Sequence, residues 1–222
     1  MITAENAVAI TKALGSGGAI LLRGRESILK GEKQNDIDLY LPAPDKEVES
    51  ILGRFEIARA GSRTPWQRKV FIRVPATEET AELDLFSELT WRGIRMLDPD
   101  LLPKATCNHL GITYLDDDAA IWLTVVKNGL HRSPTEARKL VGCGGNPSWP
   151  LALGTPGPLG HRIDQWLAVN VWTIARRGTV SWSSVFKIRL AFLTLRMIEA
   201  PIKTLKRYAI WAAHKIRQKV RI

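Results

Sequence analysis

Residues 31 to 44 read GEKQNDIDLYLPAP, and two aspartates in this stretch are separated by one apolar residue. Asp36 and Asp38 begin a run of strand-forming residues that Pro42 ends. Alternate residues of a strand share a face, so both carboxylates lie on one side, with Cα atoms roughly 7 Å apart. Ile37, Leu39 and Leu41 then face the other way. The stretch predicts a strand with one apolar face and one acidic face.

Composition and charge limit the class of protein. The chain has 222 residues, 45% of them hydrophobic, which is typical of a globular protein with an ordinary core. The two cysteines show no metal-binding or disulfide spacing. The first residues lack the pattern of a signal peptide, and no long uncharged segment predicts a membrane-spanning helix. We therefore expect a cytoplasmic protein, peripheral to the inner face of the membrane in one interpretation.

The charge is divided unevenly along the chain. Residues 1 to 118 contain 15 Lys and Arg against 19 Asp and Glu, whereas residues 119 to 222 contain 17 against 3. An acidic half can hold metal ions, and a basic half attracts phosphate, nucleic acid or an anionic membrane surface. The two halves are expected to have different partners.

The pattern of apolar residues predicts an α+β fold. A helix is expected over residues 2 to 14, a buried strand at AILLRG, the strand at residue 36, and a helix capped by Asp45. Three more strands follow at FEIARAG, RKVFIRVP and AELDLFS, and WRGIRML is a further candidate. This mixed sheet domain covers residues 1 to 115.

The second half, residues 116 to 222, is predicted to be helical and basic. Helices are expected after the aspartates at 116 to 118, from Ser133, and over about 162 to 177, 183 to 199 and 201 to 220. A Gly- and Pro-rich loop at about 142 to 160 interrupts them.

A third aspartate has the same kind of surroundings as the first two. Asp84 stands between Leu83 and Leu85, so it leaves its strand on the face opposite to them. If its strand neighbours that of Asp36 and Asp38, three carboxylates converge, and a hard cation such as Mg²⁺ would offset their repulsion. Glu82 shares the face of Asp84 and competes for its role.

These residues resemble the polymerase-β-like nucleotidyltransferase superfamily, including poorly characterised bacterial members. The resemblance covers about residues 18 to 90: a strand, a glycine turn at Gly24, Asp-x-Asp twelve residues later, and a lone apolar-flanked aspartate. It implies transfer of a nucleotidyl group from a nucleoside triphosphate, ATP among them, to a hydroxyl of a sugar or glycan, a protein or a tRNA. The implied cofactor is Mg²⁺, with Mn²⁺ as a substitute.

The resemblance also assigns roles to residues. Asp36, Asp38 and Asp84 would ligate metal and form the catalytic site, while Gly24 and Arg25 would contact the triphosphate together with Lys127 from the helical half. Arg25 departs from the family pattern, which has Ser or Gly there; an arginine either holds phosphate by charge or fills its place.

The end of the chain predicts a basic amphipathic helix. Within residues 183 to 222 a single acid, Glu199, accompanies ten Lys and Arg. Three interpretations stay open: the apolar stripe packs on the domain, the helix lies on an anionic membrane surface with Tyr208 and Trp211 at the interface, or it binds an RNA backbone. The alternative function is therefore a catalytically decayed module that binds RNA or an anionic membrane through the basic half.

Overall fold

The protein is described from a computed structural model. The structure describes residues 2–15, 18–22, 24–74, 79–96, 102–104, 106–116, 119, 120, 123, 162, 165, 166, 169, 170 and 181–220. The chain forms two compact units: residues 1–89 with 102–116, and residues 90–101 with 117–222. The sequence suggested one boundary near residue 115, whereas residues 90–101 leave the first unit and belong to the second.

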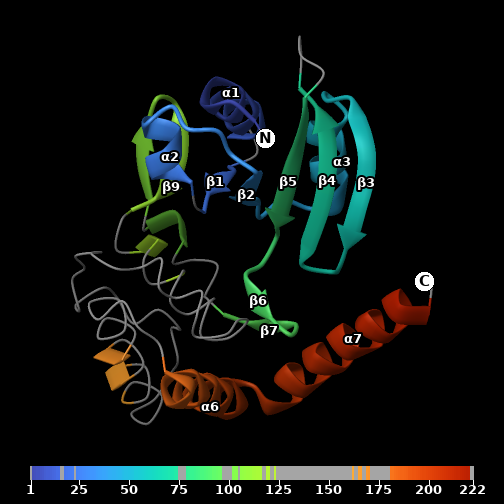
Figure 1. Ribbon diagram of the computed structural model, residues 1–222. Helices are drawn as coiled ribbons and strands as arrows, with labels where there is room; N and C mark the ends of the chain where they lie inside the picture. The colour runs from blue at the N-terminus through green and yellow to red at the C-terminus, as the bar shows by residue number, and fades with distance from the viewer. Residues whose placement is uncertain are drawn as a thin grey trace. The chain divides into compact units, whose positions relative to one another are not determined.

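The first unit is built on a seven-stranded mixed sheet with the order β3-β4-β5-β2-β1-β9-β8 (Figure 1). The pairs β2–β5 and β1–β9 are parallel, and the other neighbours are antiparallel. The strands are β1 (Ile20–Leu21), β2 (Asp36–Tyr40), β3 (Ile57–Arg63), β4 (Gln67–Arg73), β5 (Thr80–Phe86), β8 (Thr106–His109) and β9 (Ile112–Leu115).

Helices of the first unit supply the other half of its core. These are α1 (Ala4–Gly15), α2 (Arg25–Leu29) and α3 (Asp45–Leu52), with a 3₁₀ turn at Leu102–Lys104. Ile10 and Leu14 of α1 and Ile51 of α3 are buried together with Leu39 of β2 and Leu83 of β5. The predicted α+β architecture is thus confirmed at this level, with the apolar faces of β2 and β5 turned toward the helices.

Three local features differ from the sequence-based expectations. The N-cap of α3 is Pro44, and Asp45 is the first residue of the helix, where its carboxylate accepts a 2.8 Å hydrogen bond from Arg63 Nη2. The segment after Gly24 contains the short helix α2 instead of a plain connection. The antiparallel hairpin β8–β9 was not predicted, because a four-residue strand with exposed polar residues has little periodic signal.

The second unit contains the hairpin of β6 (Thr90–Trp91) and β7 (Ile94–Arg95), and the helices α6 (Trp182–Glu199) and α7 (Pro201–Val220). The last two confirm the helices expected over 183 to 199 and 201 to 220. Residues 119, 120, 123, 162, 165, 166, 169 and 170 are also helical. The helix from Ser133 and the loop at 142 to 160 lie outside the described residues.

Arg196 joins α6 to the hairpin in this unit. Its side chain is 4% exposed, its Nε donates a 2.8 Å hydrogen bond to the carbonyl of Arg95, and its Nη1 donates to Glu199. Trp91 adds an edge-to-face contact with Phe192. Polar and aromatic contacts therefore connect two segments that are about a hundred residues apart in sequence.

In the described part of the chain, none of the helices combines the length and the apolar character that crossing a membrane requires.

Candidate functional site

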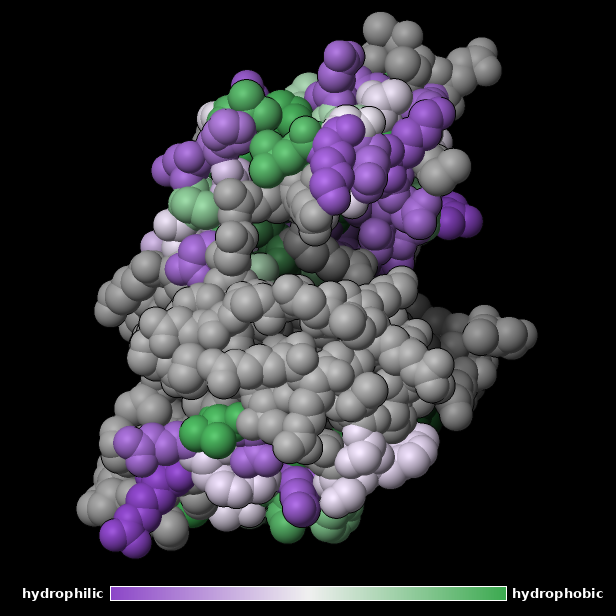
Figure 2. Space-filling view, turned by 60° about the vertical axis from the view of Figure 1, so that its left-hand side comes forward, coloured by the Kyte–Doolittle hydropathy of each residue, from purple (hydrophilic) through white to green (hydrophobic). Residues whose placement is uncertain are grey.

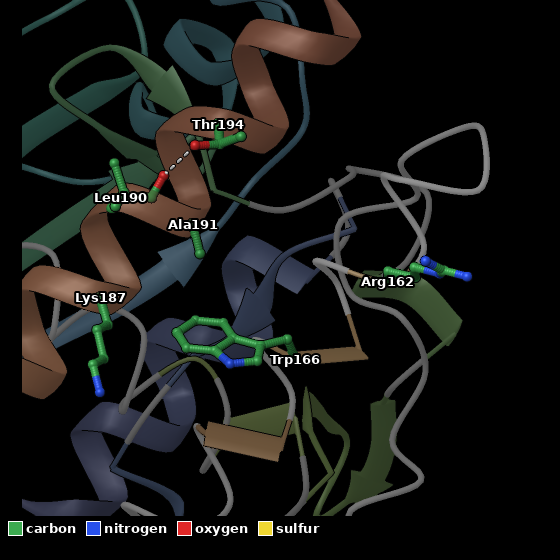
Figure 3. A pocket seen from close by; sticks show the side chains of 6 residues that line it. All are labelled: Arg162, Trp166, Lys187, Leu190, Ala191 and Thr194. Carbon is green, nitrogen blue, oxygen red and sulfur yellow. Dashed lines mark hydrogen bonds between the residues drawn. The ribbon is translucent and has the colours of Figure 1, made fainter.

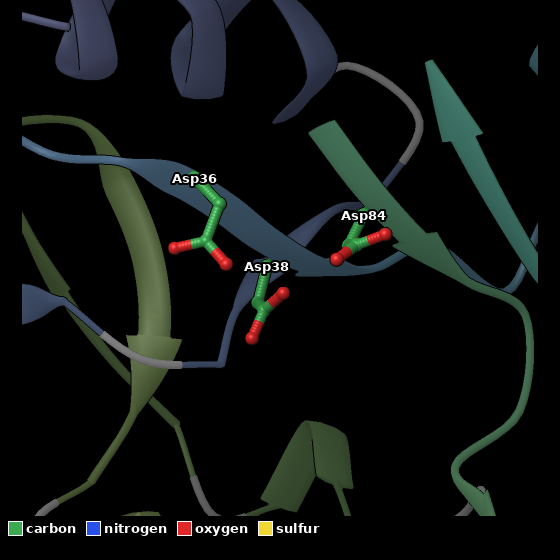
Figure 4. Close-up of side chains that lie close together, drawn as sticks. All are labelled: Asp36, Asp38 and Asp84. Carbon is green, nitrogen blue, oxygen red and sulfur yellow. The ribbon is translucent and has the colours of Figure 1, made fainter. Parts of the chain in front are cut away.

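Asp36, Asp38 and Asp84 form one cluster in the first unit. Strands β2 and β5 are parallel neighbours, and their register places Asp38 directly beside Asp84. One carboxylate oxygen from each aspartate lies within 4.8 Å of the other two. Figure 4 shows the three side chains on the same side of the two strands, with their carboxylates turned toward a common space. The convergence was expected only if these two strands are neighbours, and they are.

Burial of the apolar neighbours fixes the direction of these side chains. Ile37, Leu39, Leu83 and Leu85 are each at most 3% exposed and enter the helix-covered core. Because successive side chains of a strand point to opposite faces, the aspartates must leave on the other face. A slip of one residue in either strand would bury a carboxylate in that core, so the hydrophobic pattern specifies the register.

The three carboxylates differ in exposure. Asp38 is 1% exposed and Asp84 8%, whereas Asp36 is half-buried. Desolvation makes close negative charges costly, and a cation that binds between them offsets this cost. The electrostatics of the cluster therefore favour a bound cation.

Strand β4 supplies two polar partners for Asp84. Gln67 Nε2 donates a 3.2 Å hydrogen bond to Asp84 Oδ1, and Lys69 Nζ lies 3.6 Å from Asp84 Oδ2. Lys69 is the direct cross-strand neighbour of Asp84, so Lys69, Asp84 and Asp38 form one row across β4, β5 and β2. Gln67 and Lys69 were not identified from the sequence, because their relation to Asp84 depends on this register.

Glu82 is held by Lys69 and lies outside the cluster of three. Lys69 Nζ donates to Glu82 Oε1, and this contact is the main reason that the pKa of Lys69 is raised. Glu82 is the parallel neighbour of Asp36, yet it is Asp84 whose carboxylate converges with Asp36 and Asp38. Among the described residues, the geometry thus favours Asp84 over Glu82 as the third ligand.

Burial raises the pKa of Asp84 above its ordinary value. The nearby carboxylate of Asp38 raises it further, while Lys69 and the hydrogen bond from Gln67 lower it in part. The net direction is upward, so Asp84 retains its proton at a higher pH than an exposed aspartate does. A carboxyl group of this kind is suited to proton transfer as well as to metal binding.

The chemistry of the donor set fits a hard divalent cation. Three carboxylates offer oxygen atoms alone, which Mg²⁺, Mn²⁺ and Ca²⁺ prefer, and the cluster has none of the thiolate or imidazole groups that favour zinc. Mg²⁺ in proteins is typically bound by a few carboxylates, and water and substrate phosphates complete its coordination. Asp36, Asp38 and Asp84 could hold such an ion.

The segment that leads into Gly24 is hydrogen-bonded to the backbone of Asp38. The amide of Leu22 donates a 2.9 Å hydrogen bond to the carbonyl of Asp38, and Gly24 follows two residues later. Gly24 has φ +89°, and a Cβ there would lie 2.9 Å from Gln34 Oε1. The positive φ favours glycine, and a larger residue would also require the end of the Gln34 side chain to shift. The structure thus supplies a local reason for the turn glycine without reference to a ligand.

The other two predicted nucleotide contacts have no described side chain. Arg25 is the first residue of α2, but its side chain is not among those described, and Lys127 lies outside the described residues.

A separate hollow of about 600 Å³ lies in the second unit. It is lined by Arg162, Trp166, Lys187, Leu190, Ala191 and Thr194. Figure 3 shows the Trp166 ring below Ala191 of α6, and Thr194 Oγ1 donates a 2.9 Å hydrogen bond to the Leu190 carbonyl within the helix. The Arg162 side chain points away from the indole. The hollow contains none of the three aspartates.

Comparison of the chain with models of protein families, with curated proteins and with solved structures found no significant match.

Proposed function

We propose that this protein is a metal-dependent nucleotidyltransferase that moves a nucleotidyl group from a nucleoside triphosphate to an acceptor hydroxyl. The observation that carries the proposal is the convergence of Asp36, Asp38 and Asp84 from neighbouring parallel strands, with a carboxylate oxygen of each within 4.8 Å of the others. The glycine turn at Gly24 and the spacing to Asp36 support it, since they give the likeness to polymerase-β-like nucleotidyltransferases its specificity.

The reaction forms one bond to phosphorus and breaks another. The acceptor oxygen attacks the α-phosphorus, the bond from that phosphorus to the bridging oxygen breaks, and pyrophosphate leaves. Mg²⁺ held by the three aspartates would neutralise the phosphates and polarise the reacting oxygens. The acceptor is a hydroxyl of a sugar or glycan, of a protein side chain or of a tRNA end.

The protein's own residues position and deprotonate the acceptor. Asp84 accepts the hydroxyl proton through the carboxylate that converges with those of Asp36 and Asp38. Gln67 and Lys69 orient its carboxylate through Oδ1 and Oδ2. Arg25 and Lys127 remain the proposed cationic contacts to the triphosphate.

The test is nucleotidyl transfer from nucleoside triphosphates labelled at the α-phosphate, with Mg²⁺ or Mn²⁺, into candidate acceptor fractions. The full-length chain should incorporate label, and Asp36→Asn and Asp38→Asn should each reduce the rate by at least a hundredfold, about 2.7 kcal/mol of transition-state stabilisation. Glu47→Gln changes an exposed carboxylate on α3 and serves as the matched control. Equal incorporation by the wild type and both aspartate variants would reject these residues as the catalytic site, whereas no incorporation and no Mg²⁺-dependent nucleotide binding by the wild type would favour a binding module.

A further inference from the structure

Within the second unit, helix α7 makes its contacts with one face, and this is not the face that carries most of its apolar residues. Thr204 is buried, and its Oγ1 donates a 3.0 Å hydrogen bond to the carbonyl of Arg196. Arg207 Nε donates a 2.7 Å hydrogen bond to the carbonyl of Gly93, and the Arg92 guanidinium lies 5.7 Å from the Trp211 ring centroid. Positions 204, 207 and 211 lie on one side of the helix, which therefore faces the β6–β7 hairpin.

The apolar stripe of α7 consequently faces outward. Ile202 is 81% exposed, Leu205 58% and Ile216 63%. These residues follow the three- and four-residue steps of a single helix face, and Ala209 and Ala213 on that face are also exposed. Among the described residues of the second unit, the contacts of α7 therefore involve the other face of the helix and not this stripe. Several large apolar side chains exposed along one helix face indicate a binding surface.

Cations border one side of the stripe. By helical geometry, Lys206 and Arg217 lie along that edge, while Tyr208 lies beyond the other edge with Lys215 next to it, and all four side chains are exposed. Residues 200 to 222 contain seven Lys and Arg and no acid. Lysine and arginine with long aliphatic stems can immerse the stem beside apolar neighbours while the charged end reaches a phosphate.

Helix α6 adds further exposed apolar side chains. Trp182 is 67% exposed, Phe186 66% and Leu190 55%, and the four-residue steps place them on one face, opposite the buried Ile188 and Phe192. Figure 2 shows hydrophobic side chains next to hydrophilic ones in the lower part of the view, at the height of α6 in Figure 1. Lys187 of α6 is exposed as well, so large apolar and cationic side chains occur on both helices.

We propose that the exposed face of α7, with the apolar face of α6, binds the surface of an anionic lipid membrane. A lipid surface satisfies both components, because acyl chains receive the apolar stripe and phosphate headgroups receive the basic edge beside it. RNA would engage the cations but would leave Ile202, Leu205 and Ile216 without a role, since bases stack on aromatic rather than aliphatic side chains. A second copy of this face would bring cations against cations.

Vesicle co-sedimentation of the full-length chain tests this proposal. We expect retention on phosphatidylcholine vesicles that contain phosphatidylglycerol and little retention on phosphatidylcholine alone. Replacing Ile202 and Leu205 together by glutamine should weaken retention by about tenfold, through lost apolar burial. Replacing Lys206 and Arg217 together by glutamine should weaken it by about twentyfold at low salt.

Glutamine is a good helix former, so circular dichroism should show α7 intact in both variants. Ile57→Gln, at an exposed apolar position of the first unit, is the matched control and should leave retention unchanged. Equal retention of the wild type and the Ile202/Leu205 variant would overturn the proposal. Preferential binding of single-stranded RNA that is unchanged by the Ile202/Leu205 substitution would also overturn it. So would a wild-type dimer that the substitution dissociates, if the wild type does not bind vesicles.

The result is separable from that for nucleotidyl transfer. Asp38→Asn should not change vesicle retention, and the Ile202/Leu205 variant should transfer nucleotide to a water-soluble acceptor at the wild-type rate.

Discussion

Asp38 and Asp84 are direct neighbours in the parallel register of β2 and β5, and both are almost fully buried. The pKa of Asp84 is raised mainly by its own burial and, to a smaller extent, by the negative charge of Asp38. Two buried carboxylates that are both negatively charged destabilise the fold unless a cation or a proton neutralises them. The site therefore carries an electrostatic cost that a bound cation would relieve.

The first prediction concerns the pH dependence of stability without metal. Because the pKa of Asp84 is higher in the folded than in the unfolded chain, the folded chain holds more protons between those two values. The free energy of unfolding must then fall as the pH rises through that interval. Asp84→Asn should be more stable than the wild type above it and equally stable at lower pH, as measured by urea unfolding with EDTA.

Glu47→Gln, at an exposed position, is the control for that series and should follow the wild-type pH profile. If Asp84→Asn is destabilised at neutral pH relative to acid pH, the charge on Asp84 is favourable in the fold, and the electrostatic account fails.

The second prediction concerns Lys69. Its ammonium donates to Glu82 and lies near Asp84, and these acidic neighbours raise its pKa, so it is charged at neutral pH. Lys69→Met should raise the pKa of Asp84 further, because a cation that lowers it is lost, and should destabilise the chain by about 1 kcal/mol. Carbon-detected NMR titration of the aspartate carboxyls measures the first effect. Lys69→Arg retains the charge and should leave the titration of Asp84 close to that of wild type.

The third prediction separates two reasons for a glycine at residue 24. Gly24 has φ +89° and a close approach to Gln34 Oε1, whereas Gly31 has φ +72° and open space where a Cβ would lie. Alanine at either position costs about 1 kcal/mol for the left-handed backbone. Gly24→Ala should cost more than Gly31→Ala in urea unfolding, because the Gln34 side chain must also shift. Equal costs would show that Gln34 moves away freely.

Much of the first unit follows from the sequence. The alternation in DIDLYL and ELDLF predicts two strands and the face on which each aspartate lies. If Ile37 or Leu83 pointed away from the core, the neighbouring aspartates would point into it. The sequence does not predict that β5 inserts between β4 and β2. That order depends on long-range pairing across the sheet, which no local pattern encodes.

The partners of Asp84 and the orientation of α7 were not predictable for related reasons. Gln67 and Lys69 contact Asp84 because of one antiparallel register, and α7 is oriented by single hydrogen bonds such as that from Arg207 to Gly93. Helical periodicity identifies the apolar stripe of α7, but it does not show which face the protein covers.

Titration of the metal-free, full-length chain with Mn²⁺, followed by the electron paramagnetic resonance signal of free Mn²⁺, measures directly whether the three aspartates bind a divalent cation. We predict that the wild type binds Mn²⁺, that Mg²⁺ competes for the site, and that Asp38→Asn lowers the affinity at least tenfold while Glu47→Gln does not. Absence of binding to the wild type, or unchanged binding after Asp38→Asn, would contradict a metal site formed by Asp36, Asp38 and Asp84.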